Sequence, residues 1–331
     1  MVYTFDQSKV GGDMTLLPLL TLFITAITTT DAKKFNIVTT TAMVGDIAKS
    51  VVGDRGIIKG LMGEGVDPHL YKPTAADAKA ILSSDIVFYS GLMLEGRMTD
   101  TFMKAARIGK TVYPVTELID ESFLLEPPEM KGHWDPHVWM DVSAWSHAVD
   151  AIASAMCEQD QEHCDAYKKC AAEYKEELTA LHTYIKKSIA SIPETSRVMI
   201  TAHDAFNYFG RAYGIEVIGI QGLSTESEAG IDDINKLVDL LVERQIKAVF
   251  VESSVSDRNV NALIEGAASR GHEVIIGGRL FSDAMGEHGT YEGTYMGMLD
   301  HNATIITRAL GGKAPERGMQ NKLSSEKNDA H

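Results

Sequence analysis

A long stretch without glycine or proline divides this sequence into two halves. It runs from His163 to Ile192 and is followed by Pro193. Its residues favour helix, and a continuous helix over this stretch would extend roughly 45 Å at the α-helical rise. Because proline cannot continue a helix, the pattern predicts that the helix ends just before Pro193. A helix of this length can run the full height of a domain and join two lobes.

On both sides of this stretch, short β-branched runs alternate with helical patterns. Strand-like runs such as FNIVTTTAM and DIVFYSG precede it, and RVMITAHD, AVFVESS and EVIIGG follow it. This alternation is typical of parallel sheets with covered faces. At 331 residues the chain is also longer than one core usually supports. We therefore expect an α/β fold of two four-stranded parallel-sheet (βα)4 lobes, over 33–160 and 194–312, bridged by one long backbone helix within 161–193.

The N-terminal segment resembles an export signal. MTLLPLLTLFITAIT (Met14–Thr28) has about the length of a signal-peptide apolar region and is short for a membrane span. Ala32 is a small residue suited to cleavage, so we predict a signal peptide over 1–32. The preceding region is poor in basic residues, which leaves an uncleaved anchor or a buried helix as alternatives. No cysteine lies near the cleavage site, and we therefore expect a soluble periplasmic protein without a lipid anchor.

Composition restricts the partners and the chemistry of the chain. The formal net charge is −15, and no basic stripe is present to meet phosphates, which argues against a nucleic-acid partner. Cys157, Cys164 and Cys170 lie close together, and two of them can pair across the EQDQEH turn and leave one free. The tail over 313–331 has no apolar periodicity and is expected to be disordered.

One five-residue phrase occurs twice in the N-terminal half. Asp-Pro-His, a branched aliphatic and an aromatic residue occupy Asp67–Tyr71 and again Asp135–Trp139. Proline fixes its own φ and keeps the preceding residue extended, so each histidine is presented from a stiff turn. The aspartate can accept from nearby backbone N–H groups or hold one imidazole nitrogen. The phrase therefore suits a metal ligand, although two accidental turns would also contain it.

Two further polar groups lie where strands of the second half end. His203 ends the strand RVMITAH, and Asp283 follows the strand EVIIGG. Ligands of open α/β sheets gather at the carboxyl ends of the strands. We therefore expect His69 and His137 from one lobe to meet His203 and Asp283 from the other in the cleft between the lobes.

Three imidazoles and one carboxylate indicate which metals suit this site. Zn²⁺ takes this donor set readily, and Mn²⁺ or Fe²⁺ can use an aspartate that binds through both oxygens. Four protein ligands also leave no open position, whereas catalytic zinc usually keeps three protein ligands and a water. The pattern therefore favours a structural or transport site over a metal-dependent hydrolase.

Other polar residues near these motifs remain secondary candidates. His133 is a possible accessory ligand and His288 a possible rim residue. Glu252, at the end of the strand AVFVE, could support His203 or replace a ligand, although a plain strand-end acid is the simpler interpretation. Asp204 is expected to cap the helix that follows it.

At these residues the chain resembles the metal-receptor class of ABC-transporter solute-binding proteins, in particular the TroA-type zinc/manganese-binding proteins. The resemblance runs from about Ile37 to Leu310 and rests on LMGEGVDPHLY, DPHVWMDV, VMITAHDAFNYFGRAYG, FVESSV and GGRLFSDAMGEHGTYEGTY. It implies two (βα)4 lobes with one metal in the cleft, bound by His69, His137, His203 and Asp283. Histidine at the position of His203 favours zinc, because manganese-selective relatives have glutamate there.

The resemblance also implies a function. The protein would capture one Zn²⁺ or Mn²⁺ ion, with Fe²⁺ a weaker choice, and deliver it to an ABC permease driven by its ATPase subunit. It would be a monomer and would catalyse no reaction. Segment 117–133 is not rich in histidine, unlike the loop of many dedicated zinc receptors, so a purely zinc role is less secure. A mononuclear metal-dependent hydrolase that uses the same cleft is the alternative, and a surface adhesin is a third.

Overall fold

The computed structural model describes residues 34–128 and 130–325. The expected signal peptide over 1–32 lies outside the described residues. The described residues belong to one compact unit that begins at Lys34. None of the described helices is long and apolar enough to cross a membrane.

The N-terminal lobe contains one four-stranded parallel sheet. Its strands lie in the order β2-β1-β3-β4. The elements of this lobe are β1 (Phe35–Thr39), α1 (Ala42–Val52), β2 (Gly56–Gly60), α2 (Ala75–Ser83), β3 (Ile86–Tyr89), α3 (Thr99–Arg107) and β4 (Thr111–Pro114). Thr74 and Asp77 form a capping box at the start of α2, because each side chain accepts from the backbone N–H of the other. The helix therefore begins where the sequence indicates, a few residues after the first DPH phrase.

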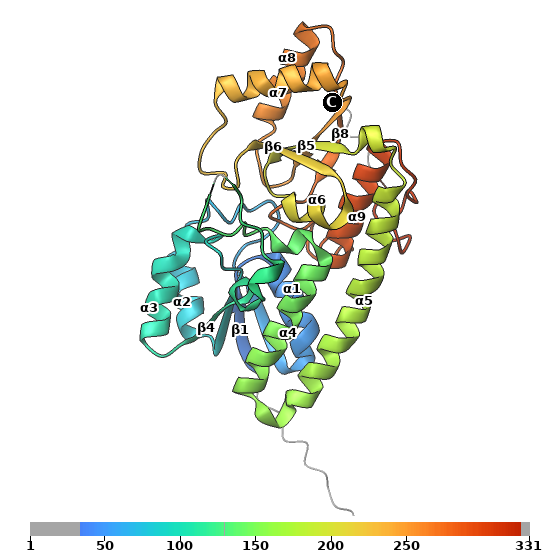
Figure 1. Ribbon diagram of the computed structural model, residues 1–331. Helices are drawn as coiled ribbons and strands as arrows, with labels where there is room; N and C mark the ends of the chain where they lie inside the picture. Colours follow the sequence, from blue (N-terminus) through green and yellow to red (C-terminus); the bar gives the residue numbers. More distant parts are fainter. Residues whose placement is uncertain (1–33, 129, 326–331) are drawn as a thin grey trace, which may run out of the picture. The chain divides into compact units, whose positions relative to one another are not determined.

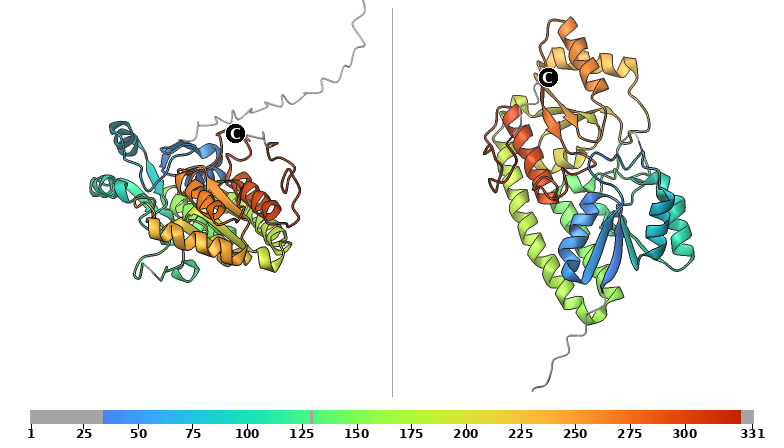
Figure 2. Two further views of the ribbon diagram at one scale, coloured as in Figure 1. Left: turned by 90° about the horizontal axis from the view of Figure 1, so that it is seen from above. Right: turned by 180° about the vertical axis from the view of Figure 1, so that it is seen from behind.

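The predicted long helix is α5 (Cys164–Ala190), and it follows α4 (Val142–Gln159). Asp141 caps α4 by accepting from the backbone N–H groups of Ser143 and Ala144. The helix α5 packs against α4 and α1 on one side of the molecule and against α9 (Tyr295–Ala309) of the C-terminal lobe. Figures 1 and 2 show α5 running beside both lobes. A long helix therefore joins the lobes, as predicted.

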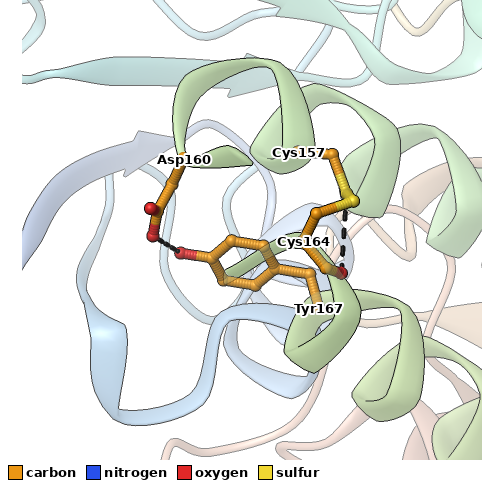
Figure 3. Close-up of a disulfide and its surroundings, with 4 residues drawn as sticks. All are labelled: Cys157, Asp160, Cys164 and Tyr167. Carbon is orange, nitrogen blue, oxygen red and sulfur yellow. Dashed lines mark hydrogen bonds between the residues drawn. A yellow bond between two sulfur atoms is a disulfide. The ribbon is translucent and has the colours of Figure 1, made fainter. Parts of the chain in front are cut away.

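A disulfide links α4 to α5 across the turn between them. It joins Cys157 to Cys164 across the turn, and Cys170 is free and half-buried. Beside the disulfide, the hydroxyl of Tyr167 donates to the carboxylate of Asp160 at 2.7 Å (Figure 3). The expectation that two of the three cysteines pair across this turn is confirmed.

The C-terminal lobe also has parallel strands, but their pairing differs from the expected single sheet. Its elements are β5 (Val198–His203), α6 (Asn207–Tyr213), β6 (Glu216–Gln221), α7 (Ile231–Arg244), β7 (Ala248–Glu252), α8 (Arg258–Ser269), β8 (Ile275–Leu280) and α9. In the described structure β5 pairs with β6 and β7 with β8, while β5 contacts β7 without a ladder between them. At the end of β5, where His203 pairs with Gln221 of β6, the N–H of His203 donates to the side chain of Glu252, the last residue of β7. A side-chain bond therefore joins β5 to β7 at this point.

The two lobes share one apolar core. The largest cluster of buried apolar side chains includes Ile37 of the N-terminal sheet, Phe250 and Leu280 of the C-terminal strands, and residues of α4, α5 and α9 between them. Domains that move freely usually meet through smaller and more polar contacts. This core opposes a wide opening between the lobes.

The segment expected to be disordered packs on the C-terminal lobe as far as it is described. The N–H of Met319 donates to both oxygens of Asp300 at 2.9 Å, and the N–H of Ser324 donates to Glu292 at 2.6 Å. Leu323 is buried. The prediction of disorder was therefore wrong for 313–325, because buried acidic acceptors distant in sequence hold a segment that has no periodicity of its own.

Candidate metal centre

Four side chains from different loops converge between the two lobes. His69 follows β2, His137 precedes a short 3-10 helix (Val138–Met140), His203 ends β5, and Asp283 follows β8. Each offers one ligand atom, and these atoms all lie within 4.8 Å of one another. All four residues are buried, with His69 the most exposed at 6% and His137 and His203 at 0%. The structure brings together the four residues that the sequence singled out.

The distances between the four groups suit a small cation at their centre. Nε2 of His69 lies 3.3 Å from Nε2 of His137. The carboxylate oxygens of Asp283 lie 3.6 Å from Nε2 of His69, 3.5 Å from that of His137 and 3.2 Å from that of His203. A tetrahedral zinc site with bonds of about 2.0–2.1 Å has ligand-to-ligand distances of about 3.3–3.4 Å. These four separations are close to those of such a site, and every pair of ligand atoms lies within 4.8 Å.

Three polar atoms of the cluster have no hydrogen-bond partner outside the cluster. They are Nε2 of His203 and both carboxylate oxygens of Asp283, all of them buried. Buried polar atoms in folded proteins nearly always have a partner, because desolvation without one is costly. A cation bound by these atoms would supply the missing interaction.

Asp135 holds His137 in the orientation that a ligand needs. One carboxylate oxygen accepts from the backbone N–H of His137 at 2.9 Å and from its ring Nδ1 at 2.8 Å. A proton on Nδ1 leaves the lone pair of Nε2 facing the cluster. The aspartate of the second DPH phrase therefore sets the tautomer of its histidine.

Glu252 does the same for His203. Its two oxygens accept from the backbone N–H at 2.8 Å and from Nδ1 at 2.5 Å, and Glu252 is fully buried. Glu252 therefore supports His203 and is neither a plain strand-end acid nor a member of the cluster.

The charges of the site shift the protonation of its members in opposite directions. Burial lowers the pKa of His69 to about 4 despite the nearby charge of Asp283, so His69 is neutral at physiological pH. Burial also lowers the pKa of His203, but Glu252 and Asp283 outweigh this effect and raise the pKa well above its usual value. For Asp283, burial raises the pKa, and the three histidines more than reverse the shift and lower it. Without metal, the site therefore holds a proton on His203 beside the Asp283 carboxylate.

The cluster opens to solvent on the side of His69. His69 lines a cavity of about 520 Å³, here called the cleft-mouth cavity, together with Arg97, His133, Ser224, Glu226 and other residues. His133 is exposed there and does not join the four-residue cluster. His288 is exposed and also lies outside the cluster. Asp204 does not cap α6, whose first turn has no side-chain cap.

Several contacts that hold the site were not predicted. Nε1 of Trp139 donates to the carbonyl of Ser282, the residue before Asp283, at 2.9 Å. Thr225 donates to Asp67, and Asn207 donates to Asp135. Each of these bonds joins residues at least 72 positions apart, so no local pattern marks them. The contacts that orient the four clustered side chains can be recognised only in the folded chain.

Comparisons with known proteins agree with this architecture. A model of the family described as zinc-uptake complex component A, periplasmic (ZnuA), matches residues 37–309. The manganese-binding lipoprotein MntA of Bacillus subtilis (strain 168) is 50% identical over 84% of this chain and 90% of that protein. The zinc-binding protein TroA of Treponema pallidum (strain Nichols) is 43% identical over 92% of this chain and 99% of that protein.

The likeness extends to solved structures. The periplasmic zinc-binding protein TroA from Treponema pallidum matches with a TM-score of 0.81 at 43% identity, and the match covers 84% of this chain and 99% of that one. The family match over residues 37–309 spans strands of both lobes and the long helix.

Proposed function

We infer the function of this chain from its family, because it belongs to the ZnuA family of periplasmic metal-uptake components and is a TroA-type receptor of that family. It is a solute-binding protein of an ABC metal importer. Its role is to capture a divalent transition metal outside the cytoplasm and to deliver it to the permease.

We propose that His69, His137, His203 and Asp283 bind one metal ion. The observation that carries this proposal is the convergence of four buried ligand atoms within 4.8 Å, among which Nε2 of His203 and both oxygens of Asp283 have no other partner. The surrounding carboxylates of Asp135 and Glu252 orient two of the imidazoles in advance. Little rearrangement is then needed on binding, which favours high affinity.

The donor set favours Zn²⁺ over Mn²⁺ in affinity. Zinc accepts four nitrogen and oxygen ligands in a tetrahedron. Among divalent metals of the first transition row, Mn²⁺ binds most weakly to a given set of such ligands, and Zn²⁺ binds more tightly. Manganese can still bind if both oxygens of Asp283 coordinate, and these oxygens already face different histidines. The relatives above are named for manganese in one case and for zinc in the other. We therefore propose that both ions bind and that zinc is held more tightly, with Fe²⁺ a weaker third ligand.

The proposed partners are an ABC permease and its ATPase subunit, to which the chain delivers the ion as a monomer. The shared apolar core limits the lobes to small displacements, so release requires the loops that carry the ligands to move. We propose an exported location for the receptor, in agreement with the periplasmic family and with the signal-like segment before Lys34.

The hydrolase alternative is not supported. The relatives of this chain are solute-binding proteins. Four protein ligands would also leave no position on zinc for an activated water. Glu252, the buried acid that a hydrolase could use as a general base, has both oxygens occupied in holding His203. We propose a role without turnover.

Metal competition on the mature chain from about Lys33 tests this function. The metal-free protein would be titrated with Zn²⁺ and Mn²⁺, separately and together, and bound metal counted by elemental analysis. We expect one tight equivalent that Zn²⁺ holds against excess Mn²⁺. In His69→Ala and His137→Ala variants we expect affinity to fall at least about tenfold. His133→Ala, in the same cavity but outside the cluster, is the matched control, and equal affinity in all variants would contradict the assignment.

A further inference from the structure

The two DPH phrases are tied to the C-terminal lobe in the same way. One oxygen of Asp67 accepts from the N–H of His69 at 2.8 Å, and the other accepts from the hydroxyl of Thr225 at 2.5 Å. One oxygen of Asp135 accepts from the N–H of His137, and the other accepts from the side chain of Asn207 at 3.1 Å. Each aspartate therefore connects its histidine to the opposite lobe.

The two connections differ in strength. Asp135 is fully buried, holds the ring as well as the backbone of His137, and its carbonyl oxygen accepts from Tyr208 at 2.8 Å. Asp67 is only half-buried and reaches His69 through its backbone N–H. His69 is thus restrained through fewer contacts than His137, and its position depends more strongly on the bond from Thr225.

The same loop of the C-terminal lobe also crosses the cleft-mouth cavity. Thr225 and Glu226 lie between β6 and α7, in a segment that reaches toward the N-terminal lobe in Figures 1 and 2. The side chain of Glu226 accepts from Nε of Arg97 at 2.8 Å, and both residues line the cavity that leads to His69. This ion pair is substantially exposed and contributes little by itself. A displacement of the loop would break both contacts together and leave the other three ligands in place.

We propose that the metal enters and leaves past His69, and that Thr225 is a positioning residue that controls release by holding Asp67 and, through it, His69. The inference rests on the proposed function, because it requires the four-residue cluster to bind the ion. A partner that draws the loop at 222–230 away from the N-terminal lobe would open the site at one ligand without separating the shared core.

The test compares metal dissociation from variants at position 225. Zinc-loaded protein would be mixed rapidly with excess chelator and the release of Zn²⁺ followed in time. We expect Thr225→Val to release zinc about tenfold faster or more, the effect of losing a hydrogen bond to a charged acceptor. Thr225→Ser keeps the hydroxyl and should restore the wild-type rate to within about twofold. Thr183→Val removes an exposed hydroxyl from α5 and serves as the matched control.

A second readout separates positioning from folding. The visible spectrum of Co²⁺-loaded protein reports coordination, and we expect Thr225→Val to change its intensity while the melting temperature of the metal-free protein stays that of the wild type. Thr225→Ala repeats the test with a smaller side chain if the valine variant fails to fold. Wild-type release rates and an unchanged spectrum in a folded variant that binds one equivalent would overturn this inference alone. Failure of the wild type itself to retain one equivalent would overturn the proposed function and the inference with it.

Discussion

The indole Nε1 of Trp139 donates a hydrogen bond of 2.9 Å to the carbonyl oxygen of Ser282. Trp139 ends the second DPH phrase, and Ser282 directly precedes Asp283, so the bond joins the loops of His137 and Asp283, two members of the cluster that belong to different lobes. The carbonyl oxygen of Trp139 in turn accepts from the hydroxyl of Tyr295 at 2.7 Å. The aromatic residue of the phrase is therefore part of the support of the site as well as of the core.

Replacing Trp139 by phenylalanine should weaken metal binding. The change leaves the buried carbonyl of Ser282 without its donor, which costs about 1–3 kcal/mol and frees the loop that carries Asp283. We expect a lower melting temperature and a several-fold loss of zinc affinity, measured by competition with a chelator.

Trp145 provides a matched control for this variant. It is also fully buried, but its Nε1 has no hydrogen-bond partner. Trp145→Phe removes the same atoms without breaking a bond and should leave zinc affinity unchanged. Equal affinity losses in both variants would show that packing, and not the bond to Ser282, positions Asp283.

The charge of Glu252 should strengthen the binding of zinc by His203. Glu252→Gln keeps the size of the side chain and removes the charge that raises the pKa of His203. We expect zinc affinity to fall about 10–100-fold, as is usual when the partner of a metal-bound histidine is changed. Glu265→Gln, an exposed acid on α8, is the control. Wild-type zinc affinity in Glu252→Gln would show that the charge of Glu252 does not contribute to metal binding.

Metal binding should displace about one proton at neutral pH, because the raised pKa of His203 keeps it protonated in the metal-free site. Calorimetric titrations in buffers of different ionisation enthalpy measure this proton. Affinity should fall as the pH is lowered, and more steeply near pH 4, where His69 also takes up a proton. Proton release close to zero at pH 7 would contradict the assigned protonation.

The same shift predicts how the stability of the metal-free protein depends on pH. The pKa of folded His203 lies above that of the unfolded chain, so its contribution is fully present below about pH 6.5 and is lost as the pH rises through the folded pKa. The gain in melting temperature on adding zinc should therefore increase with pH. A zinc-induced gain in melting temperature that decreases as the pH rises would contradict this prediction.

Loss of the disulfide should lower stability without altering metal binding. For its short loop, the chain-entropy model gives about 2–3 kcal/mol for the Cys157–Cys164 bond. It joins α4 to α5, and neither helix carries any of the four clustered residues (Figure 1). The double Cys→Ser variant should melt several degrees lower and bind zinc normally, whereas Cys170→Ser should change neither the melting temperature nor zinc binding. A large loss of zinc affinity would contradict this separation.

The sequence indicated which four residues would lie together, because the position of each depends on local structure. Proline stiffens the turns of His69 and His137, and His203 and Asp283 lie at strand ends that parallel-sheet topology brings to one edge. Thr225, Asn207 and Ser282 act through bonds that only the tertiary fold creates. No periodicity in the sequence distinguishes them from other loop residues.

The two differences in the C-terminal lobe have the same origin. A four-stranded ladder was expected from strand number alone, but the N–H of His203 donates to Glu252 where the ladder would continue. The segment at 313–325 was expected to be disordered, yet Asp300, a buried acid on α9, accepts from it. In both places a buried carboxylate distant in sequence accepts from a backbone N–H group.

Anomalous diffraction from a crystal of the zinc-loaded protein tests the central claim most directly. The account predicts one strong zinc peak about 2.0–2.1 Å from Nε2 of His69, His137 and His203 and from a carboxylate oxygen of Asp283. A zinc peak elsewhere, for example at His133 in the cleft-mouth cavity, with none among these four residues, would contradict it.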